Sequence, residues 1–283
     1  MSASIDNLIN VNFTKGRNDL LNFGLKLGGR GDHNPYISPL NRLIILLFSN
    51  NEQGAFYIPR PIVNGVQSLF QDSAGTVPVT ADGDPGGKML DQSPNSINAS
   101  QSVSAERPVY TLANGLDFLL FDEVDDRMFF PFIAGDADNF VFSIAVTPEV
   151  ASDNNPRYFG LVGTGINLQC GYVNNGTVFT RVGSVAQTTV SSITLGNTYV
   201  ISHIRQGGVS SIRINGTVFS LGGSGPSANS MLSNTGVLGA GYEPGSFKLK
   251  GKIHAALFRY GSITEGQLSD IDTYFASVAG VTL

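Results

Sequence analysis

Short runs of alternating apolar and polar residues, separated by turn residues, recur through the sequence from Ala55 onward. In one run Phe140, Phe142, Ile144 and Val146 occupy every second position, so a strand here has one strongly apolar face. Similar alternation covers residues 199–204, and a further strand is expected near 252–260. Many short strands with regular turn signals predict a mainly β sandwich or jelly roll.

The dipeptide Asn215-Gly216 is the strongest local hairpin signal in the chain. It joins the β-forming runs 212–214 and 217–219. A type I′ turn needs φ above zero at both central residues, and Asn followed by Gly meets this need most easily. The sequence therefore predicts an antiparallel strand pair over residues 212–219.

The composition agrees with a β-rich chain. Among 283 residues there are 34 glycines, and only 14% of the residues are charged. This is typical of a turn-rich protein with a polar, uncharged surface. The length suffices for one large β domain with an appended segment, or for two small domains.

Charge and cysteine content exclude several functions. The formal net charge is −5 and no cluster of Lys and Arg stands out, so phosphate-driven binding of nucleic acid is not expected. The single cysteine, Cys170, excludes an internal disulfide and a thiolate zinc cage. The N-terminus lacks a signal-peptide pattern, and the longest apolar run, Leu43–Phe48, is too short to cross a bilayer. We therefore expect synthesis in a reducing cytoplasm and no membrane insertion.

The first 54 residues predict a segment appended to the sandwich. Alternation within residues 5–13 predicts a strand, and Ser38-Pro39 is typical of a helix start. Apolar residues at helical spacing then form one face of a short helix. We expect residues 1–54 to attach the protein to a neighbour and residues 55–283 to form the sandwich. The candidate docking residues are Ile9, Val11, Phe13, Leu40, Leu43, Ile44, Leu47 and Phe48.

A second helix is predicted at the C-terminus. Thr264 and Gln267 are spaced as a capping box, and Ile263 and Leu268 as a hydrophobic staple around it. Gly280 is placed to end the helix. The expected buried stripe is Leu268, Ile271, Phe275 and Val278.

Several separated segments resemble a known family. Leu116–Arg127, which contains F-D-E-V-D-D, is similar to a strand pair that usually reads L-x-F-D-G-V-D-D, with Glu123 where glycine is more common. Tyr199–Phe219 is similar to the central hairpin of that family, and Ile263–Leu268 to its closing helix. The family is the concanavalin A-like, or laminin-G-like, jelly roll that is common in structural proteins of tailed phages.

The stretch from residue 43 to residue 107 resembles a lead-in found in phage and prophage proteins. Its similar parts include Leu69–Thr76 and Pro78–Thr80. Together the resemblances cover about residues 55–280. They imply a concanavalin A-like jelly-roll sandwich with a short C-terminal helix, preceded by the appended strand and helix.

The same resemblance implies a non-enzymatic virion structural protein: a capsid decoration, a head fibre, or a tail or baseplate component. The expected location is the virion. The expected partners are other virion proteins and further copies of the chain, for which a trimer is natural. One alternative is a carbohydrate-binding module that recognises host surface glycans, and a second is a polysaccharide depolymerase. No cofactor is expected.

The acidic residues 122–126 come nearest to a catalytic or metal-binding motif. Related β-glucanases place three acids as E-x-D-x-x-E. Glu123 and Asp125 begin this pattern, but Met128 stands where the third acid is required, and the chain has no tryptophan. Calcium needs six to eight oxygens, and the spacing does not match an EF-hand, so a solvated acidic turn is favoured. We therefore expect no catalytic and no metal-binding residue.

The three histidines and the cysteine carry no recognisable motif. His33, His203 and His254 lack metal-binding spacing, and the last two fall within predicted strands. Cys170 lies in an apolar run and is expected to be a small core residue.

Overall fold

The computed structural model describes most of the chain after residue 36. Contacts between residues divide the chain into two compact units, Met1–Ser38 and Pro39–Leu283. The predicted strand with Ile9, Val11 and Phe13 lies outside the described residues, so its docking role stays a prediction. The described residues are 37–132, 135–136, 138–152, 155–162, 168–182, 185–224, 234–241 and 247–283.

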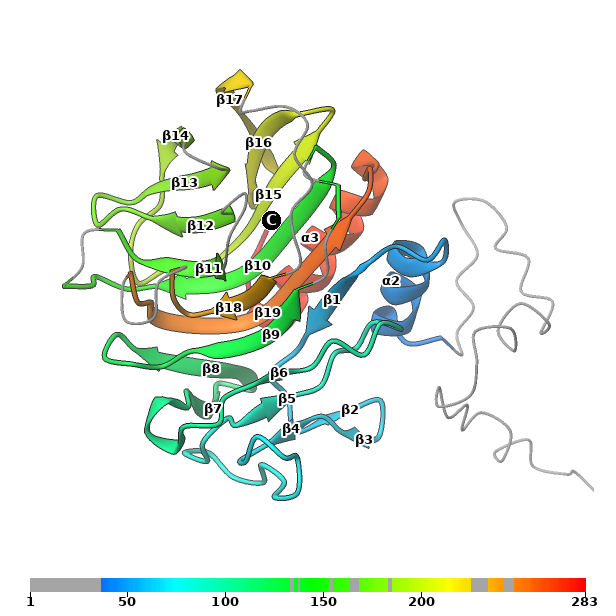
Figure 1. The fold of residues 1–283 in the computed structure, drawn as a ribbon, viewed down its shortest axis with the longest axis vertical. Helices are drawn as coiled ribbons and strands as arrows, with labels where there is room; N and C mark the ends of the chain where they lie inside the picture. Colours follow the sequence, from blue (N-terminus) through cyan, green and yellow to red (C-terminus); the bar gives the residue numbers. More distant parts are fainter. Residues whose placement is uncertain are drawn as a thin grey trace, which may run out of the picture. The chain divides into compact units, whose positions relative to one another are not determined.

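The second unit contains two large antiparallel sheets (Figure 1). The first, of eight strands, has the order β17-β16-β15-β10-β19-β8-β7, and β1 pairs with the far end of β19. Its strands are β1 (Gly54–Tyr57), β7 (Val109–Ala113), β8 (Leu116–Asp122), β10 (Phe140–Pro148), β15 (Tyr199–Gln206), β16 (Val209–Ile214), β17 (Thr217–Ser224) and β19 (Lys250–Tyr260).

The second sheet has nine strands in the order β14-β13-β12-β11-β18-β9-β6-β5-β4. A separate hairpin pairs β2 (Ile62–Val63) with β3 (Val66–Gln67), and a 3-10 turn spans Ser104–Glu106. The strands of the nine-stranded sheet are β4 (Leu69–Phe70), β5 (Lys88–Met89), β6 (Ala99–Ser100), β9 (Met128–Phe132), β11 (Arg157–Val162), β12 (Leu168–Tyr172), β13 (Thr177–Val182), β14 (Val185–Ser192) and β18 (Asn234–Leu238).

Alternation along β10 explains why the sheets stack. Phe142 and Ile144 point into a core shared with the nine-stranded sheet, where the Phe142 ring stacks on Phe159 at a centroid distance of 4.2 Å. Val141 and Ala145 point the other way, into a second apolar cluster. The predicted class is confirmed: a mainly β, jelly-roll-like sandwich with a short C-terminal helix.

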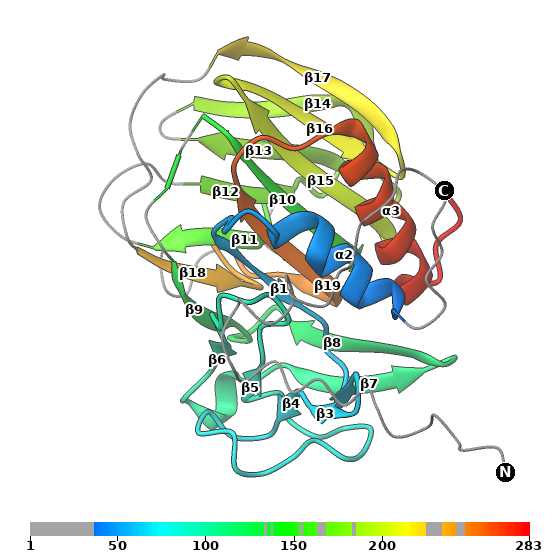
Figure 2. The same cartoon turned by 90° about the vertical axis from the view of Figure 1, so that its right-hand side faces the viewer.

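Two helices cover the outer side of the eight-stranded sheet. Figure 2 shows α2 (Pro39–Phe48) and α3 (Glu265–Ala279) lying side by side across it. Their apolar stripes meet the sheet in the second cluster, where Phe56 packs on Phe275 at 5.6 Å between ring centroids. Both faces of β10 are therefore buried.

The helix α2 belongs to the compact unit that begins at Pro39, whereas the sequence placed it in a segment ending at residue 54. Of its five candidate docking residues, Ile44 is half-buried. The other four pack inside the unit and are buried: Leu40, Leu43, Leu47 and Phe48. The stripe is therefore occupied within the fold, and an attachment role for residues before it stays a prediction.

The predicted helix caps and hairpin turn are confirmed. The Thr264 side chain accepts a hydrogen bond from the Gln267 amide, and the Gln267 side chain accepts one from the Thr264 amide. Gly280 ends α3 in a left-handed conformation with φ of 67°. Asn215 and Gly216 have φ of 45° and 81°, as a type I′ turn requires, and they join β16 to β17.

A buried histidine ties the two sheets together. His203 on β15 has one ring nitrogen hydrogen-bonded to the Tyr158 hydroxyl and the other to the Thr180 hydroxyl. Both partners lie on the nine-stranded sheet. Burial lowers the pKa of His203 to about 3, so the imidazole is neutral at physiological pH. The expectation that His203 is a hydrogen-bonded sheet residue agrees with these contacts.

Among the described residues, none of the helices has the length and apolar character needed to cross a membrane.

Candidate functional site

The outer face of the nine-stranded sheet is defined by the residues that alternate with its core residues. On β12, Leu168, Cys170 and Tyr172 belong to the core, so Gln169 points outward. Gln169 lies opposite Gly160 on β11 and opposite Arg181 on β13. Among the described elements, α2 and α3 contact the other sheet and not these strands, yet the outward residues Arg157, Gln169 and Phe179 are buried.

The Gln169 amide is oriented and incompletely bonded. Its side chain is fully buried, and its Oε1 accepts a hydrogen bond of 3.1 Å from Arg157 Nε. This contact leaves the Nε2 donor on the far end, where it has no hydrogen-bond partner among the described residues. A buried donor without a partner costs about 1–3 kcal/mol. Gln169 therefore offers a donor that an acceptor on a ligand would satisfy.

Arg157 is held in an aromatic stack beside Gln169. Its guanidinium carbon lies 4.0 Å from the centroid of the Phe179 ring and 4.6 Å from that of Phe247. The Phe247 carbonyl accepts a hydrogen bond of 2.9 Å from the Arg157 amide. Phe247 itself has φ of 57°, a left-handed conformation that costs a bulky residue about 1–3 kcal/mol. Strain of this kind is concentrated at functional sites.

The acidic turn, residues 122–126 between β8 and β9, is a second cluster. Carboxylate oxygens of Asp122, Asp125 and Asp126 lie within 4.8 Å of one another. Asp126 Oδ2 accepts a hydrogen bond of 3.0 Å from the Asp122 amide, and Asp122 Oδ1 accepts one of 2.7 Å from the Val124 amide. The loop therefore folds its three aspartates toward one point.

Asp126 departs from the expected solvated turn. Its side chain is buried, whereas Asp122 is exposed and Asp125 is half-buried. Burial, followed by the negative charge of Asp122, raises the pKa of the Asp126 carboxyl to about 7. Such a group can hold a proton at neutral pH beside an ionised carboxylate. Three converging carboxylates are also oxygen donors of the kind that calcium takes.

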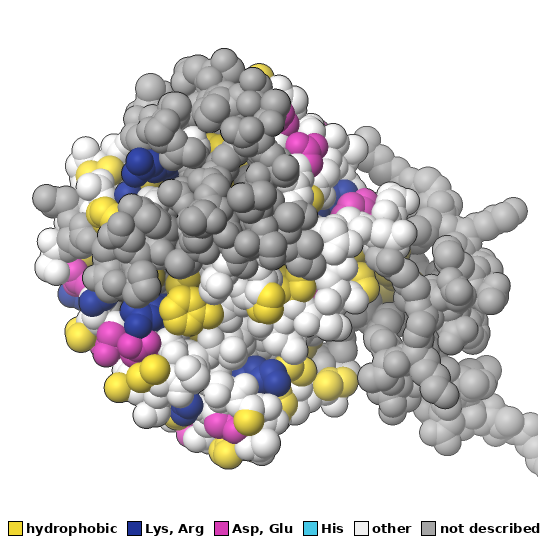
Figure 3. Space-filling view, viewed as in Figure 1, with side chains coloured by type: hydrophobic (Ala, Val, Ile, Leu, Met, Phe, Trp, Pro, Cys, Tyr) yellow, Lys and Arg dark blue, Asp and Glu magenta, His cyan; other side chains and the backbone are white. Residues whose placement is uncertain are grey.

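The chain from Phe247 to Lys250 joins the two clusters. The Lys248 ammonium donates to the carbonyl of Val124 in the acidic turn, and the Lys250 ammonium lies 4.0 Å from the Glu123 carboxylate. Phe247 meanwhile lies in the Arg157 stack. In Figure 3, dark blue and magenta side chains meet at the lower left, in the region where the turn between β8 and β9 lies in Figure 1. The acidic turn therefore borders the outer face.

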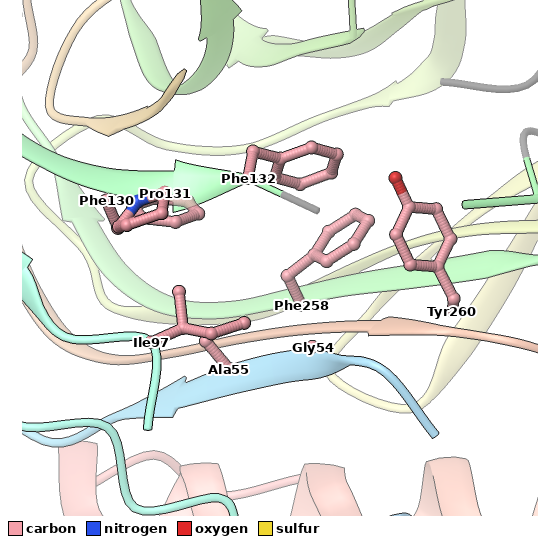
Figure 4. Close-up of a pocket in the computed structure, with 8 residues that line it drawn as sticks. All are labelled: Gly54, Ala55, Ile97, Phe130, Pro131, Phe132, Phe258 and Tyr260. Atoms are coloured by element: carbon pink, nitrogen blue, oxygen red, sulfur yellow. The ribbon is translucent and has the colours of Figure 1, made fainter. Parts of the chain in front are cut away.

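A small apolar pocket lies elsewhere, between β9 and the β1–β19 pair (Figure 4). Its walls include Phe132, Phe258 and Tyr260, and the buried Tyr260 hydroxyl has no hydrogen-bond partner among the described residues. Its volume of about 10 Å³ admits one water molecule at most, whereas ligand pockets measure ~300–1,000 Å³. We assign this pocket to imperfect packing of the aromatic core.

The remaining residues singled out in the sequence take structural places. His254 lies on β19, with Nε2 hydrogen-bonded at 3.1 Å to the Thr147 hydroxyl. Cys170 is buried in the core as expected. His33 lies outside the described residues. Gln169, Arg157 and Phe247 were not predicted from the sequence, although a polar Gln169 between Leu168 and Cys170 is a signal of an outward position.

Comparisons with known proteins identify the fold. No protein-family model and no curated protein matches the sequence. A mutant GH54 α-L-arabinofuranosidase, soaked with 4-nitrophenyl α-L-arabinofuranoside, matches with a TM-score of 0.59 at 10% identity, over 86% of this chain and 65% of that one. A Trypanosoma rangeli sialidase in complex with sialic acid matches with a TM-score of 0.52 at 16% identity, over 80% of this chain. The chain spans only 37% of that sialidase.

A third similar structure is a single domain, and the match covers almost all of it. Domain 4 of a GH43 extracellular arabinanase from Geobacillus stearothermophilus, in complex with arabinotriose, matches with a TM-score of 0.50 at 14% identity. The match covers 78% of this chain and 98% of that domain. At such identities these similarities establish a shared fold.

The comparisons correct two predictions. A non-enzymatic virion structural protein was expected; this is contradicted, because the three similar structures above come from a sialidase, a GH43 arabinanase and a GH54 arabinofuranosidase. The expectation that the chain is not an enzyme is contradicted on the same ground. The short motifs that suggested a phage protein reflect the sandwich fold, and this fold serves many unrelated functions. The virion location stays a prediction.

Proposed function

We propose that this protein binds carbohydrate on the outer face of its nine-stranded sheet. The observation that carries the proposal is the Gln169 amide, a buried and oriented donor next to the Arg157 stack. Binding sites fix a ligand with a small number of placed polar groups and supply contact area from aromatic rings. Both kinds of group occur together here, on a fold that also forms the arabinotriose-bound domain.

Titration calorimetry against a panel of oligosaccharides tests the proposal. We expect at least one oligosaccharide to bind, and Gln169→Met, which keeps the side-chain length and removes the donor, to weaken it about tenfold. Gln206→Met, an exposed change on the other sheet, is the matched control and should bind as the wild type does. Equal affinities for Gln169→Met and the wild type, or no binding across the panel, would refute this site.

A second candidate function is glycoside hydrolysis at the acidic turn, and the raised pKa of Asp126 favours it. A glycosidase pairs a protonated carboxyl with an ionised one, and retaining enzymes hold the two ~5–5.5 Å apart. Asp126, with a pKa of about 7, is the proton donor to the leaving oxygen, and Asp122, with a carboxylate oxygen within 4.8 Å and so closer than this spacing, is the second carboxyl. The proton returns to Asp126 from the water that completes hydrolysis.

Release of reducing ends from a bound oligosaccharide tests this second function. Asp126→Asn should abolish hydrolysis and leave affinity unchanged, because binding is assigned to the Gln169 region. Asp270→Asn, an exposed change on α3, serves as the control. Hydrolysis by Asp126→Asn at the wild-type rate would contradict the assignment of Asp126 as the general acid.

A further inference from the structure

The sequence contains four Asn-Gly dipeptides: Asn64-Gly65, Asn114-Gly115, Asn175-Gly176 and Asn215-Gly216. In such a pair the glycine amide nitrogen can attack the side-chain carbonyl carbon of the asparagine, because glycine has no side chain to hinder the approach. The product is a cyclic succinimide, and the step needs no enzyme. All four pairs share this local chemistry, so the structure around each one decides which of them reacts.

Three of the four pairs have the same backbone geometry. They form the two-residue turns of the hairpins β2–β3, β7–β8 and β16–β17. In chain order, φ of the asparagine is 49°, 54° and 45°, and φ of the glycine is 78°, 77° and 81°. These values fit a type I′ turn in each case. Differences in reactivity among the three turns therefore arise from the contacts of the asparagine side chain.

Side-chain hydrogen bonds hold the asparagine in two of these turns. Asn64 Nδ2 donates to Oδ1 of Asn41 on α2 at 2.8 Å. Asn215 Oδ1 accepts a hydrogen bond of 2.8 Å from the Val200 amide of β15. Each bond must break before the carboxamide can rotate toward the glycine nitrogen, so both asparagines are protected.

The fourth pair, which precedes β13, is restrained at both reacting groups. Asn175 Oδ1 accepts a hydrogen bond of 3.0 Å from the Thr177 amide. The Gly176 amide, which would be the nucleophile, donates to the Val173 carbonyl at 2.7 Å. The Gly176 carbonyl in turn accepts from the Ile193 amide at 2.6 Å. Ring closure here would break contacts on both sides of the peptide bond.

Asn114, at the tip of the β7–β8 hairpin, lacks such restraints. Its side chain is exposed and forms no hydrogen bond with any residue that the structure describes. Around Gly115, beyond its chain neighbours, no atom lies within 4 Å of the position that a Cβ would take. In Figure 2 this tip projects to the right, beyond the strands β2 to β6. Both reacting groups are therefore free to move.

We propose that Asn114 is a site of spontaneous deamidation. The Gly115 amide nitrogen gives its proton to water or hydroxide and bonds to Asn114 Cγ. The Cγ–Nδ2 bond breaks, and Nδ2 leaves as ammonia with a proton from the solvent. A water molecule then opens the succinimide at either of its carbonyl carbons, which gives aspartate or isoaspartate. This modification lies on the eight-stranded sheet and does not depend on the proposed ligand site.

Either product changes the β7–β8 hairpin. One added carboxylate takes the formal net charge of the chain from −5 to −6. Isoaspartate also adds a methylene group to the main chain, and the two-residue turn then no longer matches the pairing of Ala113 with Leu116. Since β7 is the last strand of the eight-stranded sheet, the disturbance should stay at this edge.

Peptide mapping by mass spectrometry of the full chain tests the site. The native protein is kept at physiological temperature and mildly alkaline pH and is sampled over several weeks. We expect Asn114 to convert first, about fivefold or more faster than Asn64, because the Asn64 hydrogen bond must break before the ring closes. The same protein in concentrated urea is the control, and there the four sites should convert at similar rates.

Two variants separate the causes. Asn114→Gln should remove the main acidic species from ion-exchange chromatography, because the longer side chain closes a ring far more slowly. Asn41→Ala removes the acceptor of the Asn64 hydrogen bond. It should speed conversion of Asn64 about fivefold and leave that of Asn114 unchanged. Circular dichroism confirms that each variant is folded.

Three outcomes overturn the inference. Equal rates for Asn114 and Asn64 in the native protein would show that the side-chain hydrogen bond gives no protection. Earlier conversion at any of the other three Asn-Gly pairs would place the site elsewhere. An unchanged Asn114 in the native protein, while the chain in urea converts completely, would show that the folded turn itself prevents ring closure.

Discussion

On the eight-stranded sheet, outward side chains lie under α2 and α3 and cations are paired within the fold. On the nine-stranded sheet, the strands contain cations and no carboxylate. Arg213 of β16 shows the first arrangement: it is buried and contacts Asp272 and Glu265 of α3. Arg157 of β11 shows the second: its guanidinium lies between aromatic rings and bonds an amide.

The difference separates a sheet that packs under helices from a sheet to which we assign ligand binding. A cation buried under a helix needs an acidic partner, because leaving a charge unpaired in the interior costs several kcal/mol. Arg157 is equally buried, and its guanidinium contacts the Phe179 and Phe247 rings and the Gln169 side-chain oxygen. The helices thus cover the eight-stranded sheet, and the ligand site that we propose lies on the other one.

The largest expected effect on stability comes from removing the buried ion pair between the eight-stranded sheet and α3. Asp272→Ala removes the buried partner of Arg213, and we expect the free energy of unfolding to fall by about 3 kcal/mol in urea titrations. Asp270→Ala, two residues earlier and exposed, should change it by less than ~0.5 kcal/mol. Sugar affinity should be the same in both. Similar losses for the two variants would show that the ion pair does not hold α3 in place.

The next largest effect tests the contact that His203 makes between the two sheets. His203 has a folded pKa of about 3 and an unfolded value near ~6.5, so its contribution to stability is complete above pH ~6.5 and is lost progressively toward pH 3. We expect about 3 kcal/mol of loss from this group between pH 7 and pH 4. Unfolding curves of His203→Gln should have a correspondingly smaller acid dependence. An identical pH dependence would mean that His203 is not the group responsible.

A smaller effect is expected at the acidic turn. The pKa of Asp126 is raised to about 7, so its contribution is complete below pH ~3.9 and is lost as pH rises through 7. Asp126→Asn mimics the protonated form and should be about 1–2 kcal/mol more stable than wild type at pH 8, and equal at pH 4. Asp125→Asn, at a half-buried neighbour, should gain less than ~0.5 kcal/mol.

Adding calcium distinguishes two roles for the acidic turn in the comparison of Asp126→Asn with the wild type. A cation bound by Asp122, Asp125 and Asp126 would stabilise the ionised form, so millimolar calcium chloride would remove the advantage of Asp126→Asn at pH 8. A proton-donor role predicts that the advantage persists in calcium. Thermal unfolding with and without the ion decides between the two.

The smallest effect concerns the covering helix alone. Thr264→Ala removes the side-chain half of the α3 capping box and should lower the free energy of unfolding by about 1 kcal/mol. Ser262→Ala, an exposed change just before the cap, should be neutral within ~0.5 kcal/mol. Sugar affinity should be unaffected. A loss of affinity in Thr264→Ala would show that the two faces are coupled.

Local chemistry made much of the fold predictable. The turn at Asn215-Gly216 and the cap at Thr264 depend on residues within a few positions of one another, and both were predicted correctly. The apolar stripe of α2 was also identified, but periodicity says only that a face is buried. It does not say whether the cover is a partner protein or, as found, α3 of the same unit.

The candidate site was not predictable because it depends on strands brought together by the fold. Gln169, Arg157 and Phe247 come from two strands and a loop, and no spacing in the sequence relates them. The acidic turn was noticed, yet the burial of Asp126 arises from tertiary packing. The functional prediction failed since it followed a resemblance between jelly rolls, and that architecture serves unrelated functions.

The position of Cys170 makes its thiol a chemical probe of local opening at β12. It is the only cysteine of the sequence, it follows Gln169 directly, and it points into the core on the reverse side of β12. Burial raises the pKa of its thiol well above the usual value, so alkylation waits until the strand opens. The labelling rate therefore reports opening of β12, and a sugar that engages Gln169 should slow it in proportion to its occupancy.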